Sequence, residues 1–344
     1  MYIKSLSVQN FRNHKSSSVT LDPNVNIFIG ENAQGKTNLL EAIFLTCVGR
    51  GWRSPRDKDM IMFEKDSAHV KAIATKQYGD VEVDIRLSRG ARKSININGI
   101  PVQKMGELMG QINCVFFSPD ELRLVKEAPA DRRRFLDIDI SQIDKNYFYS
   151  LMRYNKTLAQ RNMLLKSNTE DIGRGLDIWD IELAREGAKI IQRRQEFLQL
   201  LSPVVIEVHR FLTEGKEDIS IEYESSGLEF NREKDMRLRT TTVGPHRDDI
   251  KILLDEKDVR LFASQGQQRT VALSLKLAEL AIFERLTGER PVLLLDDVLS
   301  ELDAGRQARL LDLIKDGQAI VTATDKGGIA DSMKIIKIEN GKIL

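Results

Sequence analysis

The sequence predicts an α/β protein in which mixed β-sheet lobes form a head and an α-helical arm is inserted into it. Residues before 118 show mainly strand patterns, and residues 130–212 show long helical patterns with dense charge. An α/β alternation returns after residue 240. We therefore expect three segments, which are the N-terminal part of the head at 1–125, the arm at 126–240 and the C-terminal part of the head at 241–344.

The N-terminal part is predicted to hold strands around one helix. Residues 2–8 alternate polar and apolar side chains, and residues 18–21 can pair with them. Residues 25–29 form a short apolar strand, and residues 37–48 follow as a helix. Further strands are expected at 69–74, 81–87, 94–102, where Asn98-Gly99 makes a hairpin turn, and 112–117.

The arm is predicted to contain a long amphipathic helix over residues 178–212, which Pro203 is expected to kink or end. Its apolar stripe is expected to comprise Ile181, Ala184, Ala188, Ile191, Leu198 and Leu201. The C-terminal part is then expected to form helices at 267–287 and 304–315, strands at 291–295 and 319–323, and a hairpin over 334–344 with its turn at Asn340-Gly341.

The charge balance limits how this chain can hold a polyanion. Lys and Arg number 52 against 51 Asp and Glu, so binding must use a local patch and histone-like coating is excluded. The two cysteines, Cys47 and Cys114, lie in apolar runs and indicate buried thiols in a reducing compartment. No signal-peptide order and no apolar run near ~20 residues is present, so we expect a cytoplasmic protein without a membrane span.

A phosphate-binding motif lies between the strand at 25–29 and the helix at 37–48. The segment Gly30-Glu31-Asn32-Ala33-Gln34-Gly35-Lys36-Thr37 fits the pattern of Gly, four residues, and Gly-Lys-Thr. Its glycines allow backbone N–H groups to turn toward phosphate oxygens, and the helix dipole favours an anion there. Lys36 is expected to reach the β- and γ-phosphates, and Thr37 to ligate Mg²⁺. ATP and Mg²⁺ are the cofactors that this motif predicts.

Two acids end the apolar strand at 291–295. In a phosphate-loop protein such a strand end delivers a carboxylate to Mg²⁺, so we expect Asp296 on the metal side. Asp297 would face the attacking water as general base, and Lys36 and Asp297 are the expected catalytic residues. Without the phosphate loop, a buried strand followed by a solvated acidic loop would be the better interpretation.

A polar segment precedes the helix at 267–287. It comprises Ser264-Gln265-Gly266-Gln267-Gln268-Arg269, and Ser264 can cap that helix. The uncapped N–H groups of a helix start make an anion site, although alone the segment could be merely a capped helix start. Ser300-Glu301-Leu302-Asp303 follows the acidic pair at a short distance.

The order of these motifs resembles ABC-type ATPase heads of the SMC class, and within that class the RecF family of bacterial recombination and gap-repair ATPases. Five more segments extend the resemblance over nearly the whole chain, at residues 10–13, 51–54, 117–120, 132–137 and 243–249. It implies a head-to-tail homodimer in which Ser264, Gln265, Gly266 and Gln267 contact the γ-phosphate held by the other subunit. Arg12 and Asn38 join the expected cofactor-binding residues by the same resemblance.

Two departures from the ABC pattern imply weak ATP hydrolysis, and the resemblance implies that DNA stimulates it. Asp297 stands where a Glu is usual, and Thr324-Asp325 replace the switch His. The resemblance further implies duplex DNA and single-strand/double-strand junctions as ligands, and the mediators RecR and RecO as partners in recombinational repair. The ATPase subunit of a transporter and a chromosome-tethering SMC-like ATPase are the alternatives.

Two arginine clusters could neutralise DNA phosphates, although a charged run is as often a solvated face. The first follows the phosphate-loop helix at Arg50, Arg53 and Arg56, and the second opens the arm at Arg132, Arg133 and Arg134.

Overall fold

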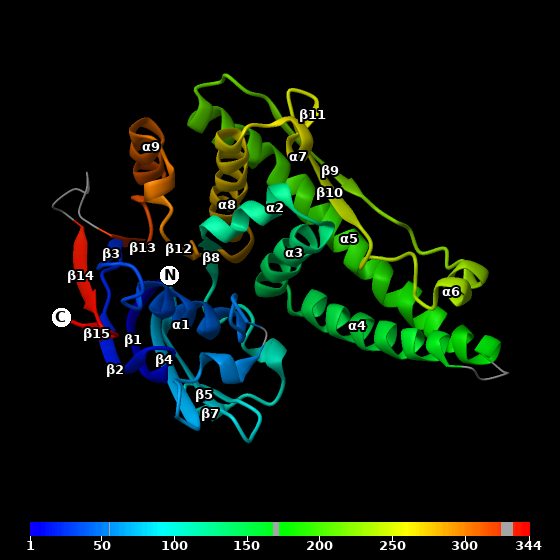
Figure 1. The fold of residues 1–344 in the computed structure, drawn as a ribbon, viewed down its shortest axis with the longest axis horizontal. Coiled ribbons are helices and arrows are strands. Elements are labelled where there is room, and N and C mark those ends of the chain that lie inside the picture. Colours follow the sequence, from blue (N-terminus) through cyan, green and yellow to red (C-terminus); the bar gives the residue numbers. More distant parts are fainter. Residues whose placement is uncertain (55, 168–171, 325–332) are drawn as a thin grey trace. The chain divides into compact units, whose positions relative to one another are not determined.

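The computed structural model of the chain describes residues 1–54, 56–167, 172–324 and 333–344 (Figure 1). These residues form two compact units. The first comprises Met1–Glu121 and Leu275–Leu344, and the second comprises Leu122–Ser274. The predicted arm at 126–240 lies within the second unit, which also contains residues 241–274.

A mainly parallel sheet forms the centre of the first unit, with the strand order β15-β14-β3-β13-β12-β8. Leu295 pairs with Val321 on one side and with Phe117 on the other, and Val321 pairs with Ile27. Because these strands are parallel, their carboxyl ends lie at one edge of the sheet. The strands are β3 (Val25–Ile29), β8 (Cys114–Phe117), β12 (Val292–Leu295), β13 (Ala319–Ala323), β14 (Lys334–Glu339) and β15 (Lys342–Ile343).

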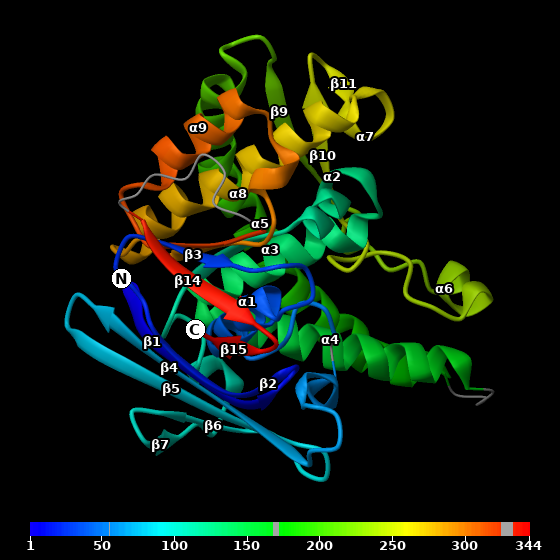
Figure 2. The same cartoon turned by 60° about the vertical axis from the view of Figure 1, so that its left-hand side comes forward.

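An antiparallel sheet completes the strands of the first unit, in the order β2-β1-β4-β5-β6-β7 (Figure 2). Side chains alternate along it, so that Leu6 and Val8 are buried whereas Ser5 and Ser7 face outward. The expected pairing of the first two strands and the Asn98-Gly99 hairpin are confirmed. The strands are β1 (Tyr2–Phe11), β2 (His14–Thr20), β4 (Ser67–Lys76), β5 (Gly79–Ser88), β6 (Ser94–Ile97) and β7 (Ile100–Pro101).

The helices of the first unit cover apolar side chains. In α1 (Lys36–Val48) most residues are buried, including Cys47, because the helix is apolar on nearly every face. Cys114 is also buried, as expected. The unit also contains α9 (Ala304–Ile314), the later part of α8 (Gln265–Thr287), and short 3₁₀ turns at Asp57–Met60, Met105–Glu107 and Leu299–Glu301.

The second unit is built on two long helices that lie side by side, α4 (Lys145–Lys166) and α5 (Ile172–Thr213) (Figure 1). A three-stranded sheet in the order β11-β10-β9 accompanies them. Its other elements are α2 (Arg123–Lys126), α3 (Pro129–Ile143), β9 (Ile219–Glu224), α6 (Arg232–Leu238), β10 (Asp249–Leu254), β11 (Lys257–Asp258), α7 (Val259–Phe262) and the start of α8, while a 3₁₀ turn at Pro119–Leu122 spans the boundary.

One of the two outcomes expected at Pro203 is excluded, and the expected apolar stripe is wrong at its N-terminal end. Pro203 does not end α5, because Leu201 and Val205 on either side are fully buried and hold the helix in place. The stripe is also shifted at its N-terminal end. Ile181 is 71% exposed, whereas Leu183 and Ile190 are fully buried. Periodicity gives the spacing of a stripe, but which face is covered depends on the packed neighbours.

Buried ion pairs cross the second unit. Arg161 of α4 is fully buried and donates from Nη1 to Asp235 of α6 at 2.7 Å and from Nε to Asp180 of α5 at 2.6 Å. A hydrogen bond to α4 holds the segment that includes His246. The Tyr154 hydroxyl lies 2.7 Å from His246 Nδ1, and burial lowers the pKa of this imidazole. Polar contacts that are shielded from solvent therefore join several elements of the second unit.

Asp235→Asn is predicted to destabilise the second unit by about 3 kcal/mol or more, because it leaves the Arg161 charge incompletely compensated in the interior. Urea unfolding followed by circular dichroism measures the change. Asp177→Asn is the control, because its carboxylate is 59% exposed and pairs with Arg232 at the surface. A loss below about 1 kcal/mol is expected for it. Equal losses in the two variants would contradict the prediction.

Candidate nucleotide site

The phosphate loop lies between β3 and α1 at the carboxyl edge of the parallel sheet. Two of its residues have left-handed backbone angles, Ala33 with φ 64° and Gly35 with φ 111°. Gly35 is the N-cap of α1 and, among the described residues, no side chain caps this helix. The first amides of α1 are therefore available to an anion. Glu31, Asn32 and Ala33 are exposed, and Gln34 is half-buried.

Lys36 is folded against the loop that it is predicted to serve. Its Nζ donates to the carbonyl oxygens of Gly30 at 2.5 Å and Glu31 at 2.9 Å, and the residue is 7% exposed. Burial lowers the pKa of the Lys36 ammonium, and the carboxylates of Asp297 and Asp296 partly offset this effect. The ammonium thus lies within the electrostatic reach of both acids.

Asp296 lies between two threonine hydroxyls. Thr37 Oγ1 and Thr322 Oγ1 both donate to Asp296 Oδ1, at 2.8 and 2.9 Å. Burial raises the pKa of the Asp296 carboxyl, and these two hydrogen bonds partly counter the shift. The structure therefore brings together the expected metal-side residues Thr37 and Asp296. Thr322 was not predicted, because a threonine inside an apolar strand gives no sequence signal.

Asp297 follows with an unusual backbone conformation. Its φ is 53°, a left-handed value that is uncommon outside glycine, and its N–H donates to Thr322 Oγ1 at 2.8 Å. Ser300 Oγ donates to the Asp297 carboxylate at 3.1 Å. Such strain persists only where the surroundings enforce it. The two neighbouring acids therefore have different environments.

The polar segment Ser264–Arg269, called the signature segment below, lies at the start of α8. Its residues Ser264 and Gln267 cap each other. Ser264 Oγ accepts from the Gln267 N–H at 3.3 Å, and Gln267 Oε1 accepts from the Ser264 N–H at 2.9 Å. Gln267 Nε2 also donates to Glu217 at 3.2 Å. The capping role predicted for Ser264 is confirmed. Ser264 and Gln265 are exposed, and Gly266 is half-buried.

Three further residues lie beside the phosphate loop or its helix. Arg12 forms a bidentate pair with the buried carboxylate of Glu41, at 2.7 and 3.0 Å. Asn38 donates to Asn13 at 2.8 Å and accepts from Arg53 at 3.0 Å. The charge of Arg53 also lowers the pKa of Asp296 as one of the smaller contributions. Arg53, which was predicted to contact DNA phosphates, therefore lies at the nucleotide site.

The second arginine cluster is not uniformly accessible. Arg132 is 3% exposed, and its Nε and Nη2 donate to Asp249 at 2.6 and 2.9 Å. Its Nη1 donates to two carbonyl oxygens, those of Leu124 and Glu127. The expected DNA contact of Arg132 is therefore corrected, because its guanidinium is buried and occupied. Arg133 is half-buried and donates to Asp248 O at 2.7 Å, whereas Arg134 is exposed.

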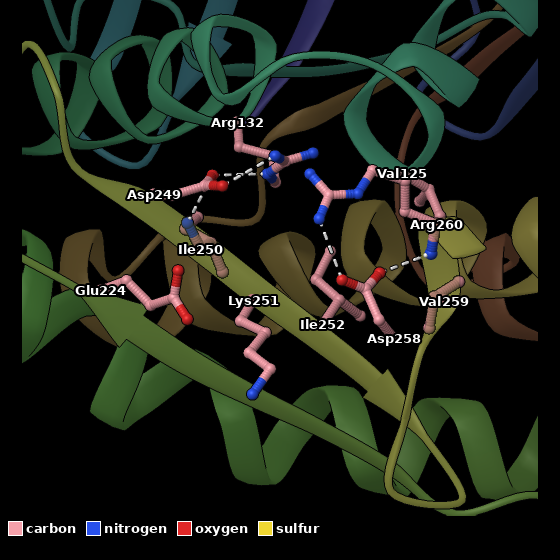
Figure 3. A pocket seen from close by; sticks show the side chains of 10 residues that line it. All are labelled: Val125, Arg132, Glu224, Asp249, Ile250, Lys251, Ile252, Asp258, Val259 and Arg260. Carbon is pink, nitrogen blue, oxygen red and sulfur yellow. Dashed lines mark hydrogen bonds and ion pairs between the residues drawn. The ribbon is translucent and has the colours of Figure 1, made fainter. Parts of the chain in front are cut away.

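A polar cavity of about 100 Å³ adjoins Arg132 in the second unit (Figure 3). Arg132 pairs with Asp249 and Arg260 with Asp258, and Lys251 and Glu224 add one charge of each sign. The lining charges balance, so the cavity has no excess of positive charge to attract an anion. Among the described residues, no group of three or more His, Cys, Asp or Glu could hold a metal ion. No described helix is long and apolar enough to cross a membrane.

Comparison with known proteins gives concordant matches. The family model for the RecF/RecN/SMC N terminal domain matches residues 2–342. The DNA replication and repair protein RecF of Clostridium perfringens strain SM101 is 43% identical over 365 residues, which cover 100% of this chain and 99% of that protein. The RecF protein of Clostridium tetani is 42% identical and is covered over 100% of both chains.

Solved structures of RecF and of Smc heads also match this chain. A structure of the recombination mediator protein RecF with ATP, from the RecFOR pathway, has a TM-score of 0.90 at 39% identity, covering 100% of this chain and 97% of that one. The Smc head domain derived from Pyrococcus furiosus has a TM-score of 0.61 at 19% identity, and it shares the fold alone.

The parallel sheet, the phosphate loop and the acidic end of β12 define an ATPase head of the ABC type. The chain belongs to the RecF family within the RecF/RecN/SMC class.

Asp296→Asn is predicted to raise the thermal stability of the nucleotide-free protein near pH 7. The raised pKa means that the protonated carboxyl suits the folded state and that ionisation opposes folding as the pH rises. Asparagine is uncharged and can accept both threonine hydrogen bonds. Thermal unfolding with and without Mg²⁺-ATP measures the change, and the variant should lose most of the stabilisation by Mg²⁺-ATP.

Asp297→Asn is the control, because this half-exposed residue should change the nucleotide-free stability by less than about 0.5 kcal/mol. A lower melting temperature for nucleotide-free Asp296→Asn than for the original chain would contradict the prediction.

Proposed function

We propose that this chain is an ATP-dependent DNA-binding protein of recombinational DNA repair, in which ATP closes a homodimer on duplex DNA near single-strand gaps. The observation that carries the proposal is the contact of Thr37 with Asp296, which joins the phosphate loop to the acidic strand end. The names of its relatives, DNA replication and repair protein RecF and recombination mediator protein RecF with ATP, support the same conclusion.

The residues present fit a magnesium-bound nucleotide. A threonine hydroxyl and a carboxylate lie 2.8 Å apart at the loop, and oxygen ligands of this kind suit Mg²⁺. Thr37 and Asp296 would hold the ion, which neutralises phosphate charge when bound. The amides of Gly30–Lys36 and the Lys36 ammonium would hold the phosphates, with Asn38, Arg12 and Arg53 beside them.

The signature segment would complete the site from a second copy. ATP can drive dimerisation only if it binds the closed dimer more tightly than the monomer. Ser264 and Gln265 are exposed at the start of α8, where the helix dipole favours an anion. A γ-phosphate contacted there supplies the required difference between ATP and ADP.

Hydrolysis would be slow and DNA-stimulated, and it would reset the dimer. Asp297 is the expected general base, and its side chain is one methylene shorter than the usual Glu. Thr324 stands where the switch His is usual, and Asp325 lies outside the described residues. The shorter Asp297 side chain would reach less far toward a nucleophilic water than a Glu side chain.

DNA contact would use the remaining exposed arginines. Arg50, Arg56 and Arg134 are exposed, and Arg133 is partly so. Such contacts bind DNA phosphates without base specificity. A protein that acts at gaps and junctions of any sequence requires this kind of binding. We infer a cytoplasmic, nucleoid-associated protein that acts with the mediators RecR and RecO. The transporter and tethering alternatives are not favoured, because the relatives that cover the whole chain are repair proteins.

Lys36→Met is predicted to abolish ATP-dependent dimerisation. The loss of a charged hydrogen bond of about 1.5–3 kcal/mol should weaken ATP binding roughly tenfold to a hundredfold. Sedimentation with ATP, with ADP and without nucleotide, each with and without duplex DNA, measures the oligomeric state. Lys15→Met is the control, because Lys15 is exposed on β2. Normal ATP-dependent dimers of Lys36→Met would overturn the proposal.

Arg56→Ala is predicted to weaken duplex binding at low salt whatever the base sequence. Each lost phosphate contact should lower the slope of log K against log salt by about 0.9. Fluorescence anisotropy with ATP at several salt concentrations measures the slope. Arg185→Ala, which removes an exposed arginine paired with Glu182, is the control. An unchanged slope for Arg56→Ala would exclude Arg56 from the DNA surface.

A further inference from the structure

The turn of the hairpin β14–β15 contacts the phosphate loop at Gln34. The Gly341 N–H donates to Gln34 O at 2.9 Å, and the Asn340 N–H donates to Gln34 Oε1 at 2.5 Å. At Gly30, a side chain would approach Ile338 O of β14 to 2.2 Å. Both ends of the loop therefore contact the strand or the turn of one hairpin, β14–β15.

The contacts leave no space for side chains at two glycines. Gly341 has φ 69°, and a Cβ there would lie 2.3 Å from Asn13 O. Gly35 has φ 111°, and a Cβ there would lie 2.6 Å from His14 Nε2. The turn at residues 12–13 is thus enclosed between the hairpin and the phosphate loop, and a shift of one element must move the others.

His14 connects the two glycines. It is fully buried, and its Nε2 lies 3.0 Å from Gly35 O while its Nδ1 lies 3.0 Å from Ser17 Oγ. Ser17 Oγ in turn donates to Gly341 O at 3.1 Å. Because a carbonyl oxygen only accepts, Nε2 carries the proton in the contact with Gly35. Burial lowers the pKa of His14, and its contacts with the backbone of Gly35 and Gly341 partly offset this shift.

We propose that His14 and the Asn340-Gly341 turn are positioning residues for nucleotide binding. Their contacts with Gly35 and Gln34 hold the phosphate loop in the conformation that binds phosphate. The left-handed conformation of Ala33 is unfavourable unless neighbouring groups enforce it, and Gly35 can adopt its own left-handed angle only because it has no side chain. Amides that already point toward the anion bind it without a further ordering cost. This inference rests on the proposed function, because it assumes that the loop binds ATP.

The chain offers a matched pair of glycines to test this proposal. Asn98-Gly99 and Asn340-Gly341 are both hairpin turns, with φ 50° and 78° in the first and 49° and 69° in the second. A Cβ at Gly99 would meet nothing within 4 Å. Gly99→Ala and Gly341→Ala therefore introduce the same backbone strain, but only the second also clashes with Asn13, whose side chain donates to Gln34 O of the phosphate loop.

Titration of each variant with a fluorescent ATP analogue and with ADP, in Mg²⁺, measures the effect. Gly341→Ala should weaken both nucleotides by on the order of tenfold or more, raising the KM for ATP while kcat at saturation stays near that of the original chain. Gly99→Ala should bind both as the original chain does. Equal affinities for the two variants would overturn the proposal.

His14 variants decide the matter if Gly341→Ala fails to fold. His14→Ala should weaken nucleotide binding, and His14→Gln should restore part of it, because its amide can donate to Gly35 O. A merely structural role predicts that affinity follows the melting temperature of the nucleotide-free protein in both variants, and this result would also overturn the proposal. Absence of ATP binding by the original chain would instead refute the proposed function.

Discussion

The hydrogen bonds of two threonines to one carboxylate are the constraint on which the nucleotide site depends. Thr37 begins the helix after the phosphate loop, Asp296 ends β12 and Thr322 lies near the end of β13. Neighbouring parallel strands in fixed register bring these groups to one edge of the sheet. A shift of one residue in β13 would turn Thr322 to the opposite face and leave the buried carboxylate with one donor fewer.

A second constraint acts on the backbone of the site. Ala33, Gly35 and Asp297 all have positive φ, and Gly35 and Asp297 contact groups from other parts of the first unit. Thr322 receives the N–H of Asp297, and His14 contacts the carbonyl of Gly35. The conformation that suits phosphate binding is therefore a property of the assembled sheet rather than of the loop sequence alone, and the C-terminal hairpin is part of that assembly.

The second unit is organised differently, around buried charges. Arg161 and Arg194 are both almost completely buried, and Arg194 donates to Asp137 at 2.8 Å and to Pro245 O at 2.7 Å. Pairs of this kind add little net stability, but they require one specific arrangement of the helices. The proposed contact of Ser264 with a nucleotide requires a fixed orientation of this residue, and the cap with Gln267 provides one locally.

Elements with strong local signals could be predicted from the order of amino acids alone. The strand-loop-helix around Gly30–Thr37, the cap at Ser264 and both Asn-Gly hairpins follow from backbone chemistry within a few residues. The sequence also indicated that Thr37 and Asp296 belong to one site. Knowledge of the packed fold was needed to show which face of α5 is buried, that Arg132 is occupied by Asp249, and that Arg53 lies at the nucleotide site. Thr322 and His14 likewise required it, because their roles depend on partners distant in sequence, and local periodicity contains no information about such partners.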